Sequence, residues 1–325
     1  MCAAQAAMNN ILHMFTEEDR ALMEDRDFES SSGSTATSAA ADAAAAEEGA
    51  EAFNRYIRLS INQDGVQPLA FDCELGYSAA ERYHFLNVGY SARKPCVTVT
   101  VTDETRGGSC TLQGVHYSER CCIGGGMEAG RRGTVPMLRG ALKAAAQLEP
   151  FSACHEVCLT DQSSKSGTCC ADFHMITHGS LKTWYEEKFD AVVLPAWERR
   201  LQDTRDALSK SVDCDSDTFC AVLLGAAQTQ GLLPWWRRVE RDAKRAFESH
   251  AAVRPACSWA ALLASLVLQF NDERGHMAKI MLTALASGQI CNGWTSSKGV
   301  GWSIPMQTVR GWDDIEISLD ETHYS

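Results

Sequence analysis

The chain has 325 residues, of which 45% are hydrophobic, and its formal net charge is −12. That length is enough for two domains, and the lack of any run of 18 apolar residues excludes a membrane-spanning helix. Residues 1–53 hold 11 of the 42 acids and 2 of the 30 bases, so residues 54–325 keep 31 acids and 28 bases, a net of −3 that implies no long-range attraction of nucleic acid.

Residues 1–53 are predicted to form an acidic, disordered, low-complexity arm. Residues 30–52 are rich in serine, alanine and glutamate, so they offer little apolar surface to offset the entropy lost on ordering. The first 15 residues carry neither the basic start nor the compact apolar run of a secretory signal. We therefore expect an intracellular, cytoplasmic protein that does not bind membranes.

Residues 54–195 are predicted to form an α/β core that begins with strands. The alternation typical of strands occurs at residues 55–61, 83–90, 96–103 and 109–117. It is clearest in the β-branched run from Cys96 to Asp103. The last three segments follow one another closely, which indicates an antiparallel meander.

A glycine-rich loop separates these strands from a helix. Residues 124–133 hold five glycines and two arginines, and residues 134–148 have helical spacing. Such a loop before a helix suits a pyrophosphate, because backbone N–H groups and the helix dipole both attract an anion. The alternative, a flexible surface turn, remains open. A mixed α/β layer is then completed by a strand at 156–160, a helix at 181–189 and a strand at 191–194.

Residues 196–325 are predicted to form a mostly helical extension that packs on this core. Helices are expected at 197–211, 218–230, 234–249, 257–270 and 277–286, and residues 315–319 alternate like a strand. In the third helix Trp235 and Trp236 precede Arg237 and Arg238. This run fits nucleic-acid binding, but nearby acids favour an amphipathic helix with a solvated face, and we expect no nucleic-acid partner.

Fourteen cysteines are dispersed along the chain without the framework of a small secreted protein. We expect them to be reduced and mostly buried. The alternative is a zinc site, since one stretch supplies thiols and a histidine pair four residues apart. Its candidate ligands are Cys154, Cys158, Cys169, Cys170, His174 and His178. No Cys-x-x-Cys pair is present, and we assign no metal ligand from the sequence.

Several segments of residues 83–195 resemble a set found together in the GNAT superfamily of N-acetyltransferase-like proteins, whose divergent members occur in large DNA viruses and protists. They are Gly133-Thr134 with the helix behind it, the strand ending Leu159-Thr160-Asp161, and Lys-Thr-Trp-Tyr-Glu-Glu-Lys-Phe-Asp-Ala at residues 182–191. The resemblance implies a GNAT-like mixed sheet flanked by helices, with acetyl-CoA bound on the loop before the helix.

The resemblance also implies which residues bind the cofactor. The pyrophosphate of acetyl-CoA would be held by Arg131, Arg132, Gly133 and Thr134. Of the three defining positions of the family's loop, only the one at Gly133 is matched, because Glu128 and Arg131 stand at the other two.

Two further residues would carry the chemistry. By resemblance, Tyr185 is the general acid toward the CoA thiolate, and it equally fits a structural aromatic packed beside Trp184. A general base must take a proton from the amine-bearing substrate. Glu119 is the candidate, with Glu104 and His116 as alternatives.

The sequence therefore predicts an acetyl-CoA-dependent N-acetyltransferase that transfers the acetyl group directly to an amine. Two alternatives remain open: a non-catalytic binding or structural module that keeps the GNAT fold with a degraded CoA loop, and an unrelated α/β protein. The identity of the substrate and the oligomeric state are not predicted.

Overall fold

A computed structural model describes the chain at residues 54–63, 68–91, 94–103, 108–115, 121–123, 134–160, 164–165, 168–253, 257–272 and 275–321. The predicted arm, residues 1–53, lies outside the described residues. The chain divides into two compact units. Unit 1 contains the described residues up to Val157 together with those from Met306 onward, and unit 2 runs from Cys158 to Pro305. The predicted domain boundary between residues 195 and 196 falls within unit 2.

Unit 1 contains sheet strands in the order β11-β1-β2-β3-β4-β5, followed by the start of β6, within which the boundary between the two units falls. Its strands are β1 (Arg55–Gln63), β2 (Leu69–Ser78), β3 (Tyr83–Ser91), β4 (Lys94–Thr102), β5 (Ser109–Val115), β6 (Glu156–Thr160) and β11 (Ile315–Glu321). Pairing is antiparallel from β11 through β5. The structure confirms the strands predicted at 55–61, 83–90, 96–103, 109–117, 156–160 and 315–319. Strand β2 was not predicted from the sequence.

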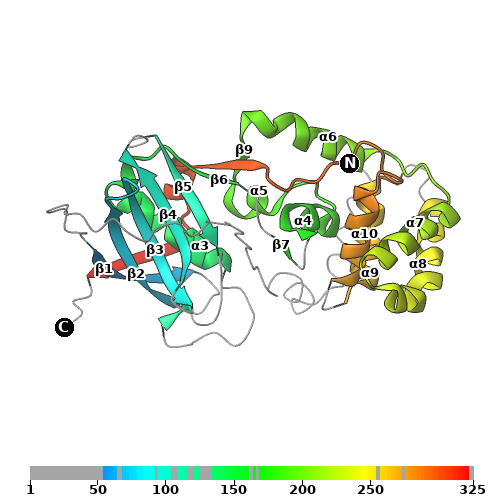
Figure 1. The fold of residues 1–325 in the computed structure, drawn as a ribbon, viewed down its shortest axis with the longest axis horizontal. Helices are drawn as coiled ribbons and strands as arrows, with labels where there is room; N and C mark the ends of the chain where they lie inside the picture. The colour runs from blue at the N-terminus through cyan, green and yellow to red at the C-terminus, as the bar shows by residue number, and fades with distance from the viewer. Residues whose placement is uncertain are drawn as a thin grey trace, which may run out of the picture. The chain divides into compact units, whose positions relative to one another are not determined.

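Helix α3 (Thr134–Gln147) contacts β1, β4 and β11 (Figure 1). Alternate residues of β1 are buried, and one of them, Ile61, faces Gly140 of the helix. A Cβ on Gly140 would lie 2.1 Å from Cδ1 of Ile61, so only glycine allows this close approach. Ala141 and Ala144 are also fully buried. The buried residues of the helix therefore combine these small residues with the larger Met137, Leu138 and Leu142.

The last strand is fastened to α3 by polar contacts. The Arg139 guanidinium donates two hydrogen bonds to the Asp314 carboxylate, at 2.6 and 2.7 Å, and lies 4.6 Å from the centre of the Trp312 ring. Lys143 donates to the backbone carbonyls of Trp312 and Ile315. Because of these contacts and the β1–β11 pairing, residues 306–321 belong to unit 1.

Two disulfides close loops in unit 1. One joins Cys96 on β4 to Cys121, and the other joins Cys110 on β5 to Cys154, just before β6. Their Cα atoms lie 6.1 and 5.9 Å apart, inside the range that a disulfide spans. The expectation that all cysteines are reduced is wrong for these four, because strand pairing brings residues distant in sequence within bonding reach.

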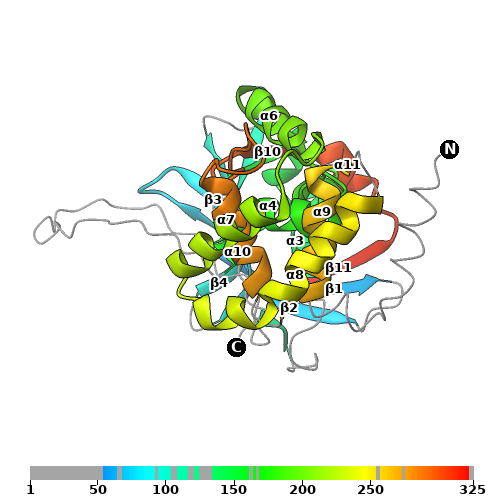
Figure 2. The same cartoon turned by 90° about the vertical axis from the view of Figure 1, so that its right-hand side faces the viewer.

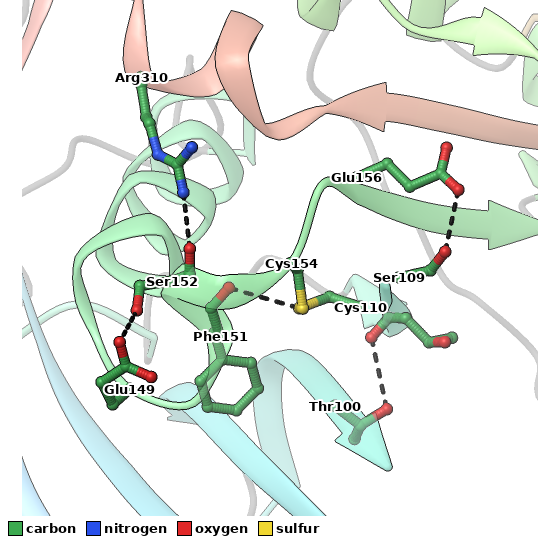
Figure 3. Close-up of a disulfide and its surroundings, with 10 residues drawn as sticks. Thr100, Ser109, Cys110, Glu149, Phe151, Ser152, Cys154, Glu156 and Arg310 are labelled. Carbon is green, nitrogen blue, oxygen red and sulfur yellow. Dashed lines mark hydrogen bonds between the residues drawn. A yellow bond between two sulfur atoms is a disulfide. The ribbon is translucent and has the colours of Figure 1, made fainter. Parts of the chain in front are cut away.

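Polar contacts surround the second disulfide (Figure 3). The Ser109 hydroxyl donates to Glu156 at 2.9 Å, and Arg310 of α11 (Met306–Arg310) donates to the Ser152 carbonyl at 2.7 Å in the short helix η4 (Phe151–Ala153). The backbone N–H of His155 donates to the Gly108 carbonyl at 2.8 Å. These bonds hold the start of β6 beside the start of β5.

Unit 2 is mainly helical. It contains β7 (Ser164–Lys165), β8 (Thr168–Cys169), α4 (Cys170–His178), α5 (Trp184–Phe189), β9 (Val192–Val193), η5 (Pro195–Trp197), α6 (Glu198–Ser209), α7 (Ser216–Thr229), α8 (Leu233–Val253), α9 (Trp259–Phe270), α10 (His276–Ala286) and β10 (Gly301–Pro305). Helix α4 contacts α9 and α10, and α7 contacts α8 and α10 (Figure 2). The helices predicted from residue 181 onward are confirmed, with shifted ends, and α4 is an addition.

The tryptophan–arginine run lies on α8. Trp235 and Trp236 are buried, whereas Arg237 and Arg238 are exposed. The amphipathic interpretation of this helix is therefore confirmed, because the indole rings belong to the core of unit 2. Elsewhere in that core, Phe219 stacks on Phe247 of α8 at 4.7 Å between ring centres.

The α/β class and a mixed sheet flanked by helices are confirmed at this coarse level. Among the described residues, no helix combines the length and the apolar character needed to cross a membrane.

Candidate functional site

Most residues of the predicted cofactor loop lie outside the described residues. This holds for Arg131, Arg132 and Gly133, and equally for the predicted base Glu119 with its alternatives Glu104 and His116. Thr134 is described: it is the first residue of α3, and it is half-buried. The structure therefore places the beginning of the helix but not the loop before it.

Tyr185 lies on α5 in an aromatic cluster. It is 5% exposed, and its ring centre lies 5.2 Å from that of Trp184, at an interplanar angle of 75°, and 5.8 Å from that of Trp302. Edge-to-face contacts of this kind stabilise a core by about 0.5–1.5 kcal/mol beyond the area buried. The geometry matches the second interpretation of this residue, a structural aromatic beside Trp184.

A cluster of two histidines and a glutamate lies in the same part of unit 2. His174 and His178 are four residues apart on α4, so both side chains lie on one face of the helix. Their rings stack at 4.1 Å between centres, with planes 30° apart. His174 is buried and His178 is exposed.

Glu187 completes this cluster from α5, which lies beside α4 (Figure 1). One of its carboxylate oxygens lies 2.9 Å from Nε2 of His174, and the other accepts a hydrogen bond from Lys188 at 3.1 Å. The hydrogen bond with His174, opposed by partial burial, lowers the pKa of Glu187 to about 2. The carboxylate is therefore charged at neutral pH. We name His174, His178 and Glu187 the His–Glu cluster.

The turn between α4 and α5 is defined by its own sequence. Gly179 follows His178 with a φ of +61°, a conformation that favours glycine. Thr183 then caps α5: its hydroxyl accepts from the Glu186 backbone N–H, and the Glu186 carboxylate accepts from the Thr183 N–H at 2.8 Å. This reciprocal capping box sets the first turn of α5 and therefore the direction of Glu187.

Arg205 of α6 holds the same turn from the other side. Its guanidinium donates to both carboxylate oxygens of Glu186 and, at 3.0 Å, to the backbone carbonyl of Leu181. Hydrogen bonds between charged groups such as these are roughly twice as strong as neutral ones. Arg205 therefore positions α5 through Glu186, the residue next to Glu187.

The first turn of α4 is anchored by a buried carboxylate. Asp172 is 2% exposed and accepts hydrogen bonds from the Ser296 hydroxyl at 2.5 Å and the Ser297 backbone N–H at 2.8 Å. A buried carboxylate is tolerated when such donors satisfy it. Both helices that carry the His–Glu cluster are thus fixed by polar contacts outside the cluster.

The three side chains present one nitrogen or oxygen ligand atom each, all within 4.8 Å of one another. In the described part of the chain they are the one group of three or more His, Cys, Asp or Glu residues with this spacing. Imidazole nitrogen and carboxylate oxygen are ligands of divalent transition metals. The sequence indicated the histidine pair but missed Glu187, because Glu186 and Glu187 look alike until the fold shows that Arg205 occupies the first.

Among the described side chains, no thiol of the predicted zinc alternative joins this group. Cys154 is bonded to Cys110 in unit 1, so it has no free thiol and cannot be a ligand. Cys158 is half-buried, and the side chains of Cys169 and Cys170 lie outside those described. The described ligand set is therefore two imidazoles and a carboxylate.

Comparison with known proteins gave no match: no family model, no curated protein and no solved structure is similar to this chain at a significant level.

Proposed function

We propose that the chain is a GNAT-like protein that binds acetyl-CoA in unit 1 and transfers its acetyl group to an amine. One observation carries the proposal: α3 begins at Thr134, directly after a stretch whose sequence holds five glycines and two arginines, and connects the neighbouring strands β5 and β6. This is the order of elements that the GNAT resemblance implies for the cofactor loop.

The start of α3 has the electrostatic character that a pyrophosphate requires. The first N–H groups of a helix lack partners within the helix, and the aligned peptide dipoles place partial positive charge there. The first turn of α3 contains no acidic residue. Arg131 and Arg132 precede it in the sequence and add two formal positive charges.

A second candidate, a non-catalytic binding module, is favoured by the surroundings of Tyr185. A general acid must come within hydrogen-bond reach of the atom that it protonates. Tyr185 is instead buried between Trp184 and Trp302. In this alternative, unit 1 still binds acetyl-CoA, but the protein does not transfer the acetyl group. The cytoplasmic location and the amine-bearing partner stay predictions in both versions.

Calorimetric titration of the full chain with acetyl-CoA tests binding. We expect the unmodified protein to bind and the variants Arg131→Glu and Gly133→Val to lose binding, because one adds repulsion and the other blocks close approach of the backbone. Arg238→Glu, a change of an exposed arginine on α8, is the control for net charge. Absence of binding at millimolar acetyl-CoA, where a free energy of only about −4 kcal/mol suffices, overturns the proposal.

Measuring acetyl transfer distinguishes the acetyltransferase from the non-catalytic binding module. If Tyr185 protonates the departing thiolate, Tyr185→Phe leaves acetyl-CoA binding intact and lowers kcat toward an amine substrate. If the chain binds acetyl-CoA without releasing CoA in the presence of polyamines or lysine-rich peptides, the non-catalytic module is the better account.

A further inference from the structure

We propose that the His–Glu cluster of unit 2 is a binding site for one divalent first-row transition metal ion, held by the imidazoles of His174 and His178 and the carboxylate of Glu187. This site does not depend on the acetyl-CoA proposal, since its three ligands are none of the residues that would hold that cofactor. Zinc is the ion that the ligand set fits best, and an external ligand such as water would complete its shell.

The spacing of the ligand atoms supports a single ion. Zinc bonds of about 2.0–2.1 Å in a tetrahedral site place the ligand atoms roughly 3.3 Å apart. Nε2 of His174 and Oε2 of Glu187 are 2.9 Å apart, and all three ligand atoms lie within 4.8 Å of one another. Opening the first distance by a few tenths of an ångström and closing the others by up to about 1.5 Å would give the spacing of a tetrahedral metal shell.

The side chains that must move are the ones with room to do so. His174 is buried and held on a helix that Asp172 anchors, so it serves as the fixed ligand. His178 and Glu187 are exposed, so their side chains border solvent. Their exposure also gives the ion a path from solvent, which a metal site requires.

The support around the ligands resembles that of metal sites. Ligands in such sites are oriented by hydrogen bonds from residues behind them. Here Lys188 donates to the second oxygen of Glu187, and Arg205 fixes the helix start through Glu186. With three protein ligands, a tetrahedral ion keeps a fourth position toward solvent, as catalytic zinc sites do.

The composition of the set narrows the choice of ion. Two imidazoles and one carboxylate suit zinc, cobalt, nickel and ferrous iron, whereas magnesium and calcium prefer oxygen ligands alone. Two-histidine, one-carboxylate sets also hold ferrous iron, so iron is a separate arm of the test.

A second pair in unit 2 provides an internal control. His276 and Asp272 approach to 2.7 Å in an i,i+4 pair, which repeats the histidine–carboxylate chemistry. Among the described residues no third ligand joins that pair. It is therefore not expected to bind the ion on its own.

The test uses the full chain, freed of metal with a chelator and alkylated with iodoacetamide so that thiols do not compete. Zinc and cobalt are titrated by calorimetry, ferrous iron is titrated anaerobically, and magnesium is the negative arm. We expect one equivalent of zinc or cobalt and a cobalt spectrum without thiolate charge-transfer bands. His178→Gln and Glu187→Gln should weaken binding by more than the roughly 10–100-fold typical of changes behind the ligands, and His276→Gln should not.

Each outcome decides the proposal. Tighter binding of ferrous iron than of zinc, lost in the same two variants, supports the site and changes the preferred ion. Equal zinc binding by the parent, His178→Gln and Glu187→Gln overturns it, and so does binding of magnesium alone. Because both variants change exposed residues, circular dichroism like that of the parent shows that any loss is not a loss of fold.

Discussion

Replacing Gly140 by alanine tests how closely α3 packs on the sheet of unit 1. The new Cβ would lie 2.1 Å from Cδ1 and 2.8 Å from Cγ1 of Ile61, whereas ordinary contacts begin at 3.4 Å. Ile61 is 1% exposed, so its side chain cannot turn into solvent to avoid the new methyl group. Overpacking of this kind costs about 1–3 kcal/mol, against a gain of about 1 kcal/mol in helix propensity. We expect a net loss of about 1 kcal/mol.

Ile61→Val removes the atom at 2.1 Å and should reverse part of this loss. Alone, Ile61→Val costs about 0.5–1.5 kcal/mol, because it deletes a buried methyl group. In the Gly140→Ala background it should cost less than alone or stabilise the protein, a coupling of about 1 kcal/mol. Gly225→Ala on α7 is the control, since a Cβ there meets nothing within 4 Å. It should stabilise by about 0.5–1 kcal/mol.

The assay must report the two units separately, because a chain of two units need not unfold in one step. Hydrogen exchange in rising urea, read in peptides from residues 134–147 and 216–229, gives the local free energy of opening in each unit. If Gly140→Ala stabilises its peptide as much as Gly225→Ala does, helix propensity has outweighed the clash and the packing argument is refuted.

Three further outcomes are expected. The hydrogen bond with His174 lowers the pKa of Glu187 from 4.5 to about 2 in the folded state. The charged carboxylate therefore contributes stability above pH 4.5, and this stability is lost as the pH falls toward 2. The pH dependence of thermal unfolding between pH 4.5 and 2 should be weaker in Glu187→Gln than in the parent. Replacing Cys110 and Cys154 by alanine should lower the stability of unit 1 by about 2–4 kcal/mol, because the disulfide between them is lost. The same hydrogen-exchange experiment measures this change. An unchanged free energy of opening would mean that the two thiols are not bonded. Asp172→Ala should cost about 2–3 kcal/mol, because the two donors that it satisfies lose their acceptor, and a change below 0.5 kcal/mol in urea unfolding would contradict that role.

Local patterns predicted most of the elements. The strand at 96–103 was predictable from β-branched alternation, and it is β4. Strand β2 was missed although Leu69, Phe71 and Cys73 alternate, because the acidic residues Asp72 and Glu74 lie on its other face. Alternation identifies a strand only when both faces are considered.

Long-range relations were beyond local patterns. The strand at 315–319 was expected from its alternation, but nothing in it indicates that it pairs with β1, more than 250 residues earlier. The disulfides depend on the same information, since spacing alone does not determine connectivity. The separations of 25 and 44 residues become contacts only through the order of β4, β5 and β6.

The His–Glu cluster was predictable in part from local spacing and in part only from the fold. The spacing of His174 and His178 on a helix was visible in the sequence. The third ligand was not, because it depends on a turn whose form is set by Gly179 and the capping box at Thr183. The pairing of Arg205 with Glu186 then leaves the neighbouring carboxylate to face the histidines.

The two disulfides of unit 1 form overlapping rings, since Cys110 lies between Cys96 and Cys121 in the sequence, and Cys121 lies before Cys154. The glycine-rich loop at residues 124–133 belongs to the ring that Cys110 and Cys154 close. A single protease cut in that loop would therefore leave both halves of the chain covalently joined. The nicked protein would migrate as one band without reductant and as two with it. In a thiol-rich compartment the disulfide would be reduced, and only noncovalent contacts, such as the pairing of the strands and the packing of α3 on β1 and β4, would keep the halves together.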